Sequence, residues 1–160
     1  ISAPPVRSGT VNGGTTVTPT LLRRDAPAQG DRVISTETSY LMRRLLRSVV
    51  TEGTASFGEV EGYRVGGKTG SAELPRPDGG YYDDRNINTF AAVFPASEPE
   101  YVLVTTLYEP VETTGPEPRR TSGWTTVPVA AEVIRRVAPL LGLRPEIEQP
   151  VLSPLSSSSN

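Results

Sequence analysis

The sequence predicts an α+β fold, and two patterns along the chain support this class. Two segments carry apolar residues at the spacing of an amphipathic helix: 35–53 and 126–142. Three segments between them have the character of extended strands bounded by turn residues: 63–74, 88–95 and 101–108. We therefore expect three strands with flanking helices, followed by a C-terminal helix.

The first helix is expected to begin after Ser35, whose hydroxyl suits the N-cap, with Glu37 in a first turn where the helix dipole favours an acid. Gly53 marks its end. Its apolar residues recur at helical spacing: Leu41, Met42, Leu45, Leu46, Val49 and Val50. Its arginines fall on the other face: Arg43, Arg44 and Arg47. Exposed charges usually form a solvated face, and we interpret these arginines in that way.

The segments that follow alternate between loops and strands. We expect 54–62 to be an irregular connector and 76–85 to be a polar loop. The strand 63–74 contains glycines that weaken its strand propensity, which predicts the close approach of a ligand or of another backbone. The strand 101–108 is apolar on both faces, so we expect both faces to be covered. Residues 96–100 form the turn before it.

The final helix is expected to start near Thr126, after a second long loop. Pro139 should kink or tighten its last turn, and Gly142 should close it. The segment 146–160 is rich in proline and serine, and we expect it to be a disordered tail.

Composition excludes several kinds of site. The chain of 160 residues has no cysteine and no histidine, so it cannot form a disulfide, a zinc-thiolate site or a Ser-His-Asp triad. A general acid or base must then be a carboxylate, a tyrosine or Lys68, the only lysine. We expect no metal and no cofactor.

Charge and hydropathy exclude further classes. The formal net charge is −2, and the arginines are dispersed, so we expect no nucleic-acid partner. No apolar run approaches the roughly 20 residues that a membrane span needs, and no signal-peptide pattern is present. Because the chain also lacks an initiator methionine, we expect it to be a piece of a longer protein.

The segment 66–72 concentrates polar chemistry on a backbone of small residues. It places Lys68, Thr69 and Ser71 among three glycines. A solitary ammonium group beside two hydroxyls is the strongest candidate for a site in this sequence. The alternative interpretation is an exposed strand lysine with ordinary polar strand neighbours.

Several segments resemble, in the same order, the transpeptidase domain of the class B penicillin-binding proteins of the division type. That family has three motifs: Ser-x-x-Lys, Ser-x-Asn and Lys-Thr-Gly. Lys68, Thr69 and Gly70 match the third motif inside a strand that resembles the family's closely. The resemblance covers most of residues 11–145, through these further segments: 11–14, 19–22, 90–96, 107–110 and 127–129.

The resemblance implies acyl transfer on peptidoglycan stem peptides. An active serine attacks a D-Ala-D-Ala carbonyl, releases the terminal D-alanine and passes the acyl group to an amine of a neighbouring strand, and beta-lactams trap the acyl-enzyme. Lys68 would supply positive potential near the substrate carboxylate and assist proton transfer, and the hydroxyls of Thr69 and Ser71 would bind that carboxylate. Gly70 would let the substrate lie along the strand. The Ser71 backbone N–H would be one of two oxyanion-hole donors.

The resemblance also implies a wider architecture. The family has the fold shared by penicillin-binding proteins and serine beta-lactamases, with a five-stranded, mostly antiparallel sheet and helices on both sides. Residues 1–145 would be the C-terminal portion of this domain, supplying three adjacent antiparallel strands with the Lys68 strand at the edge and the C-terminal helix on one face. The strand 101–108 would lack its partner, so we expect the chain to fold only beside the missing N-terminal part.

The sequence departs from the family pattern at several positions. Ser-x-x-Lys cannot occur, because Val65 stands three residues before the only lysine. The nucleophile is therefore absent, and this chain alone should be inactive. The serine and asparagine of 158–160 match the second motif only by coincidence within a serine run. The segment 4–10 is too short for a helix that the family usually has at this place. Either residues are missing there or the segment is altered. The family usually has threonine where Ser71 stands.

Two other classes of function remain open from the sequence. The chain is either part of the enzyme, a non-catalytic interaction module of a cell-division protein, or an inactive fragment. The enzyme interpretation implies a peptidoglycan stem peptide and beta-lactams as ligands, and cell-division proteins as further partners. It also implies a location at the periplasmic face of the bacterial inner membrane, with an anchor outside this chain.

Overall fold

The computed structural model describes residues 9–17 and 30–146. Its helices and strands follow one another in this order: α1 (Thr36–Thr51), the short 3₁₀ helix η1 (Ser56–Gly58), β1 (Gly66–Pro75), β2 (Tyr81–Phe94), β3 (Tyr101–Tyr108) and α2 (Thr126–Val137). The predicted α+β class is confirmed, as are the order and type of the main elements. None of the helices in the described ranges is both long and apolar enough to cross a membrane.

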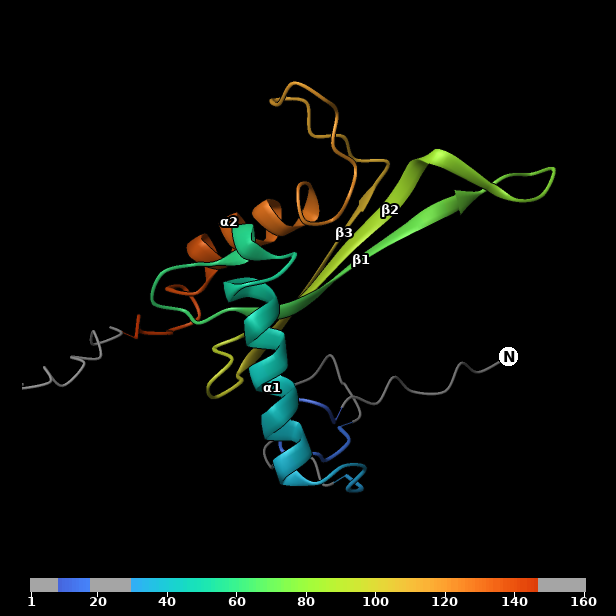
Figure 1. The fold of residues 1–160 in the computed structure, drawn as a ribbon. Coiled ribbons are helices and arrows are strands. Elements are labelled where there is room, and N and C mark those ends of the chain that lie inside the picture. The colour runs from blue at the N-terminus through green and yellow to red at the C-terminus, as the bar shows by residue number, and fades with distance from the viewer. Residues whose placement is uncertain (1–8, 18–29, 147–160) are drawn as a thin grey trace, which may run out of the picture.

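The three strands form one antiparallel sheet in the order β1-β2-β3 (Figure 1). The strand that carries Lys68 lies at an edge of this sheet, as the resemblance to the family implied. In the register, Lys68 lies opposite Ala91, which in turn lies opposite Val104. Side chains of directly paired residues share a face of the sheet, so this register decides which polar groups of β1 lie together.

Two strand boundaries were predicted wrongly. β1 begins at Gly66 rather than three residues earlier, and β2 begins at Tyr81, so the second half of the expected polar loop 76–85 is strand. The connection is a tight turn in which the N–H of Arg76 donates to the carbonyl of Gly80 at 2.9 Å. At the start of β2 only Tyr81 is paired with β1, opposite Pro75, and the register shifts between this pair and the next one, Glu73 with Asn86. The resulting hairpin extends away from the helices (Figure 1).

Helix α1 begins as predicted, since the Ser35 hydroxyl accepts a hydrogen bond from the N–H of Thr38 at 3.0 Å. It ends two residues before Gly53. Its expected apolar stripe is only partly buried, because Leu41 and Leu45 are 48% and 61% exposed. The stripe is therefore wider than the surface that the described residues offer to cover it.

The arginines of α1 do more than form a solvated face. Arg43 donates a hydrogen bond to the carbonyl of Ser97 at 2.9 Å. Arg47 donates to the carbonyl of Val65 at 2.8 Å and forms an ion pair with Glu59. These two side chains connect α1 to the residues just before β1 and to the turn after β2. The interpretation of the arginines as a solvated face was therefore wrong for Arg43 and Arg47.

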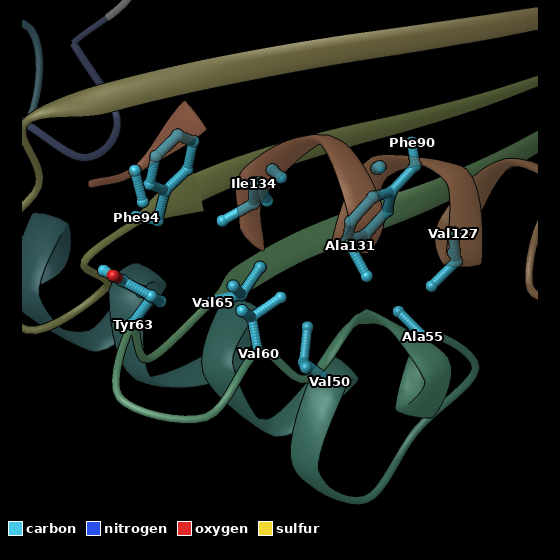
Figure 2. Close-up of a cluster of buried hydrophobic side chains, with 13 residues drawn as sticks. Val50, Ala55, Val60, Tyr63, Val65, Phe90, Phe94, Val127, Ala131 and Ile134 are labelled. Atoms are coloured by element: carbon cyan, nitrogen blue, oxygen red, sulfur yellow. The ribbon is translucent and has the colours of Figure 1, made fainter. Parts of the chain in front are cut away.

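The core lies between α2, β2 and the end of α1. Figure 2 shows Phe90 and Phe94 of β2 meeting Val127, Ala131 and Ile134 of α2, with side chains of α1 and the connector closing the cluster. Phe90, Val127 and Ile134 are completely buried. Burying a side chain of this size contributes about 1.5–3 kcal/mol, so this cluster fixes α2 against one face of the sheet, as expected.

The other face of β3 is open. Burial alternates along this strand, and Val102, Val104 and Tyr108 are 60–65% exposed. The prediction that both faces are covered is therefore wrong for the described part of the chain. Leu103 faces the core instead.

Some expectations fall on residues outside the described ranges. They concern 1–8, 18–29 and 147–160, which include most of the predicted tail and the family segment 19–22. Glu146, the first residue of that tail, is held in the fold: its N–H donates to the carbonyl of Gly62 at 2.7 Å. The expected turn at 12–14 is present, and both of its glycines have positive φ angles.

Candidate functional site

The glycines at the start of β1 are required by packing within this chain. A Cβ atom at Gly67 would lie 2.6 Å from the ring of Phe90 and 2.7 Å from the carbonyl oxygen of Ala91. A Cβ atom at Gly66 would lie 3.1 Å from the Ala96 side chain and 3.2 Å from a backbone nitrogen of α1. The predicted close approach at these two positions is therefore that of the chain's own backbone and side chains.

Gly70 differs from these two glycines. The nearest atom to a Cβ placed there would be the carbonyl oxygen of Thr89, at 3.8 Å, which is an ordinary contact distance. Gly70 is exposed and lies on a strand whose outer edge has no strand partner among the described residues. The space beside it is left free by the fold.

The alternation of the strand separates the candidate side chains into two groups. Thr69 lies opposite Phe90 and Ser71 opposite Asn88, so both point to the face that α2 covers. Lys68 lies opposite Ala91 and points to the open face, where its ammonium group donates to the carbonyl of Thr69 at 2.6 Å. The structure thus brings the two hydroxyls together and places the lysine on the other side of the same edge.

The two hydroxyls line a pocket of about 380 Å³. Its walls come from three segments of the chain: Gly53, Thr54, Ser56, Phe57, Thr69, Ser71, Thr121, Ser122, Gly123 and Trp124. The hydroxyl oxygens of Thr54 and Thr69 are 2.9 Å apart. The backbone N–H of Ser122 donates to the Ser71 hydroxyl oxygen, also at 2.9 Å. The two β1 hydroxyls in this pocket, those of Thr69 and Ser71, therefore each have a hydrogen-bond partner within the chain.

An aromatic pair forms the apolar part of the pocket. The ring centroids of Phe57 and Trp124 are 5.0 Å apart with the planes tilted by 50°, a favourable geometry for two aromatic rings. The guanidinium of Arg119 lies 3.7 Å from the centroid of the Trp124 ring. No lining residue is ionisable, so the pocket offers neutral hydrogen-bonding groups with a cation next to one of its walls.

The residues that complete this pocket were not predicted from the sequence. The segments before β1 and before α2 were expected to be a connector and a loop. Gly123 shows how closely they meet: a Cβ atom there would lie 2.5 Å from the carbonyl oxygen of Thr54. The only local signal was the cluster of small polar residues beside the sole tryptophan at 121–124, and it gave no indication of its partner.

A second pocket of about 380 Å³ lies beside α1 and is lined by several arginines, among them Arg43 and Arg47. Those two side chains already donate to acceptors within the chain. In the described ranges, no group of three histidine, cysteine, aspartate or glutamate residues is arranged to hold a metal ion. The pocket at β1 is therefore the better candidate.

The family of the chain is decided by its match to a family described as "Penicillin binding protein transpeptidase domain", which spans residues 8–135. The chain belongs to this transpeptidase family. The match includes all of β1, β2 and β3, with the segment that carries Lys68, Thr69 and Ser71. It also includes both loops that line the pocket.

Individual relatives of this transpeptidase chain agree with the match. It is 35% identical over 149 residues to a protein named probable peptidoglycan D,D-transpeptidase FtsI of Caulobacter vibrioides, covering 86% of this chain and 25% of that protein. Among solved structures it resembles the transpeptidase domain of penicillin-binding protein 3 from Burkholderia pseudomallei, with a TM-score of 0.74 and 29% identity over 87% of this chain and 41% of that one.

A further structural relative was solved in complex with a drug. It is penicillin-binding protein 3 of Mycobacterium tuberculosis in complex with aztreonam, with a TM-score of 0.62 and 29% identity over 84% of this chain and 31% of that one. The transpeptidase chain spans about a quarter or less of the length of the curated relatives it matches. It has the fold of part of the transpeptidase domain, namely three antiparallel strands with helices against them.

Proposed function

We propose that this chain is part of a peptidoglycan D,D-transpeptidase that cross-links stem peptides through a serine acyl-enzyme and binds beta-lactams. The observation that carries the proposal is the position of 66–72 at the free edge of the sheet, with Thr69 and Ser71 lining one pocket. The family match and the name of the Caulobacter relative support the reaction. The aztreonam complex of a structural relative supports the ligand class.

The stem peptide would bind along the outer edge of β1. An extended peptide can add to an exposed sheet edge through main-chain hydrogen bonds. The free space beside Gly70 supports this arrangement, since a side chain there would stand where the peptide has to approach. The hydroxyls of Thr69 and Ser71 would hydrogen-bond the terminal carboxylate of the donor peptide.

Lys68 and Ser71 would take the catalytic roles of this wall. The Lys68 ammonium, on the open face, would raise the positive potential near the ligand and help move the nucleophile's proton. The backbone N–H of Ser71 would stabilise the oxyanion that forms when the serine attacks, a contribution worth about 100- to 1,000-fold in rate when one such donor is removed. The attacking serine would come from outside these residues, since Ser-x-x-Lys does not occur in this sequence.

The reaction places further expectations on the whole protein. Residues 1–145 would form the C-terminal portion of the transpeptidase domain, and the N-terminal portion would cover the open face of β3. We place the protein at the periplasmic face of the bacterial inner membrane, where peptidoglycan stem peptides are found, with cell-division proteins as further partners. An interaction module without catalysis would bind the same partners but would not react with a penicillin.

The test uses the complete protein that contains these residues and a fluorescent penicillin. We expect covalent labelling of the unmodified protein, and loss of labelling by at least about 100-fold in Lys68→Ala because proton transfer and ligand attraction are both impaired. Labelling is measured after denaturing electrophoresis, and circular dichroism checks that the variant is folded. Unchanged labelling of Lys68→Ala would remove the lysine from the mechanism, and no labelling of the unmodified protein would favour the interaction module.

A further inference from the structure

Ser122 occupies a fixed position at the junction of β1, β2 and α2. It is 1% exposed. Its hydroxyl donates to the carbonyl of Thr89 on β2 at 2.9 Å. Its carbonyl accepts from the N–H groups of Thr126 and Val127 at 3.0 Å each, in the first turn of α2. Both contacts hold the remaining group of Ser122, its backbone N–H, in place.

That N–H donates to the Ser71 hydroxyl oxygen at 2.9 Å. A backbone N–H can only donate, so the Ser71 oxygen must accept, and its single proton has to point elsewhere. The contact between Thr54 and Thr69 is different, since either hydroxyl there can be the donor. Ser71 is thus the one pocket hydroxyl of β1 whose hydrogen-bonding direction the fold itself determines.

We propose that Ser122 is a positioning residue, whose backbone N–H holds the Ser71 hydroxyl as a hydrogen-bond donor toward a carboxylate ligand. That the ligand has a carboxylate group is an assumption that rests on the proposed function. A hydroxyl that donates to a carboxylate makes a charge-assisted hydrogen bond, which is about twice as strong as a neutral one. Ser71 is exposed, so its proton is accessible to a ligand in the pocket.

The positioning depends on the buried hydroxyl of Ser122 as well as on its N–H. Ser122→Ala keeps the N–H but removes the bond to the Thr89 carbonyl, so the loop before α2 loses its anchor on β2. The N–H then no longer holds the Ser71 oxygen at one distance and angle. A ligand carboxylate would meet a hydroxyl that has to be oriented at the moment of binding, and that ordering lowers the rate of acylation.

The first experiment tests the hydrogen bond without using activity. Site-resolved hydrogen exchange is measured at the Ser122 amide in the complete protein, in Ser71→Ala and in Ser71→Thr. We expect exchange about tenfold faster in Ser71→Ala, because the acceptor is gone, and protection retained in Ser71→Thr, which keeps a hydroxyl at the same position. Ser71 is exposed, so neither change should unfold the protein. Equal exchange in all three proteins would overturn the proposal.

The second experiment is a double-mutant cycle on the rate of acylation by the fluorescent penicillin. We expect Ser122→Ala to slow acylation about tenfold when it is the only substitution. Added to Ser71→Ala, it should slow acylation less than about twofold, because there is no hydroxyl left to position. Ser97→Ala, which removes an exposed serine hydroxyl from the turn between β2 and β3, is the control. A tenfold loss in both backgrounds would show a structural role only and would overturn the proposal.

The two experiments separate this inference from the proposed function. If the unmodified protein does not react with penicillin, the proposed function fails, and with it the role of Ser71 toward a carboxylate. Hydrogen exchange still decides whether Ser122 holds the Ser71 hydroxyl. If the protein reacts and the cycle shows no coupling, the transpeptidase function stands and the positioning role of Ser122 is wrong.

Discussion

At the scale of single residues, the glycines around Lys68 have two different physical causes. Gly66 and Gly67 stand where a side chain would collide with the chain itself, most severely with the ring of Phe90. Gly70 stands where a Cβ atom would make only an ordinary contact with the chain, 3.8 Å from the carbonyl oxygen of Thr89. A glycine that is not required by packing in the free protein is a candidate for contact with a ligand.

This difference makes a prediction for a pair of matched substitutions. Gly67→Ala should destabilise the complete protein by about 1–3 kcal/mol, since it overpacks the contact with Phe90. Gly70→Ala should change the unfolding free energy by less than about 0.5 kcal/mol, as expected for an exposed site without a collision. It should nevertheless slow acylation by a penicillin, because in the proposed arrangement the ligand approaches along the edge of β1 beside this position.

Urea denaturation and penicillin labelling of both variants check this prediction. The two glycines are three residues apart on one strand, so each variant serves as the control for the other. The interpretation is wrong if Gly70→Ala labels as fast as the unmodified protein, or if it is as unstable as Gly67→Ala.

At the scale of elements, an ion pair joins β2 to the end of β3. Arg85 donates two hydrogen bonds to the carboxylate of Glu109, one of them at 2.8 Å. Glu109 has a positive φ of 50°, an uncommon conformation for this residue, and its N–H donates to the carbonyl of Asn86. The hydrogen bond from Arg85 is the main cause that lowers the pKa of Glu109 below its ordinary value.

The lowered pKa predicts a pH dependence of stability. A carboxyl group whose pKa is lower in the folded state stabilises the fold above its unfolded pKa, which is about 4.5, and this contribution is lost as the pH falls through the folded pKa. We therefore expect Glu109→Gln to be less stable than the unmodified protein at pH 7. The difference between the two should shrink steadily below about pH 4.

Urea denaturation of the complete protein, measured from about pH 3 to about pH 7, gives this difference in stability. Glu100→Gln, a change at an exposed acid in the turn before β3, is the control and should show no such trend relative to the unmodified protein. A Glu109→Gln difference that stays constant over the whole range would show that the ion pair does not stabilise the fold.

At the scale of the whole molecule, the described chain has one well-packed face and one open face. The packed face buries Phe90 and Ile134 between the sheet and α2, whereas Val102 and Val104 on the opposite face are largely exposed. β3 is also the last strand of the sheet among the described residues. An exposed apolar edge strand favours association with another chain.

We therefore predict that the 160-residue chain, expressed alone, associates or melts without cooperativity. Replacing both Val102 and Val104 with lysine should raise its monomeric fraction, because charges on an open sheet face oppose strand-to-strand association. Leu103→Lys should not, since Leu103 points to the core and its loss unfolds the chain further. Light scattering after size exclusion, with thermal melting, measures both. A monodisperse chain with one sharp melting transition would contradict the prediction.

The sequence by itself determined the local structure of this protein and the strand that carries its candidate site. Ser35 fixed the start of α1, apolar spacing gave both helices, and Lys68, Thr69 and Gly70 identified the family strand. These features depend on neighbours within a few residues, which a sequence displays directly. The same kind of reasoning failed at the start of β2, where Tyr81 pairs with Pro75 of β1 across a shift in register that no local pattern indicates.

Only the tertiary structure decided which residues complete the pocket. Ser122 meets Ser71 across 51 positions of the chain, and Thr54 meets Thr69 across 15. Those contacts follow from the sheet register and from the docking of α2 on Phe90 and Ile134, and neither is encoded in a short stretch of sequence. The same docking leaves Val102 and Val104 open, because α2 can cover only one face of the sheet.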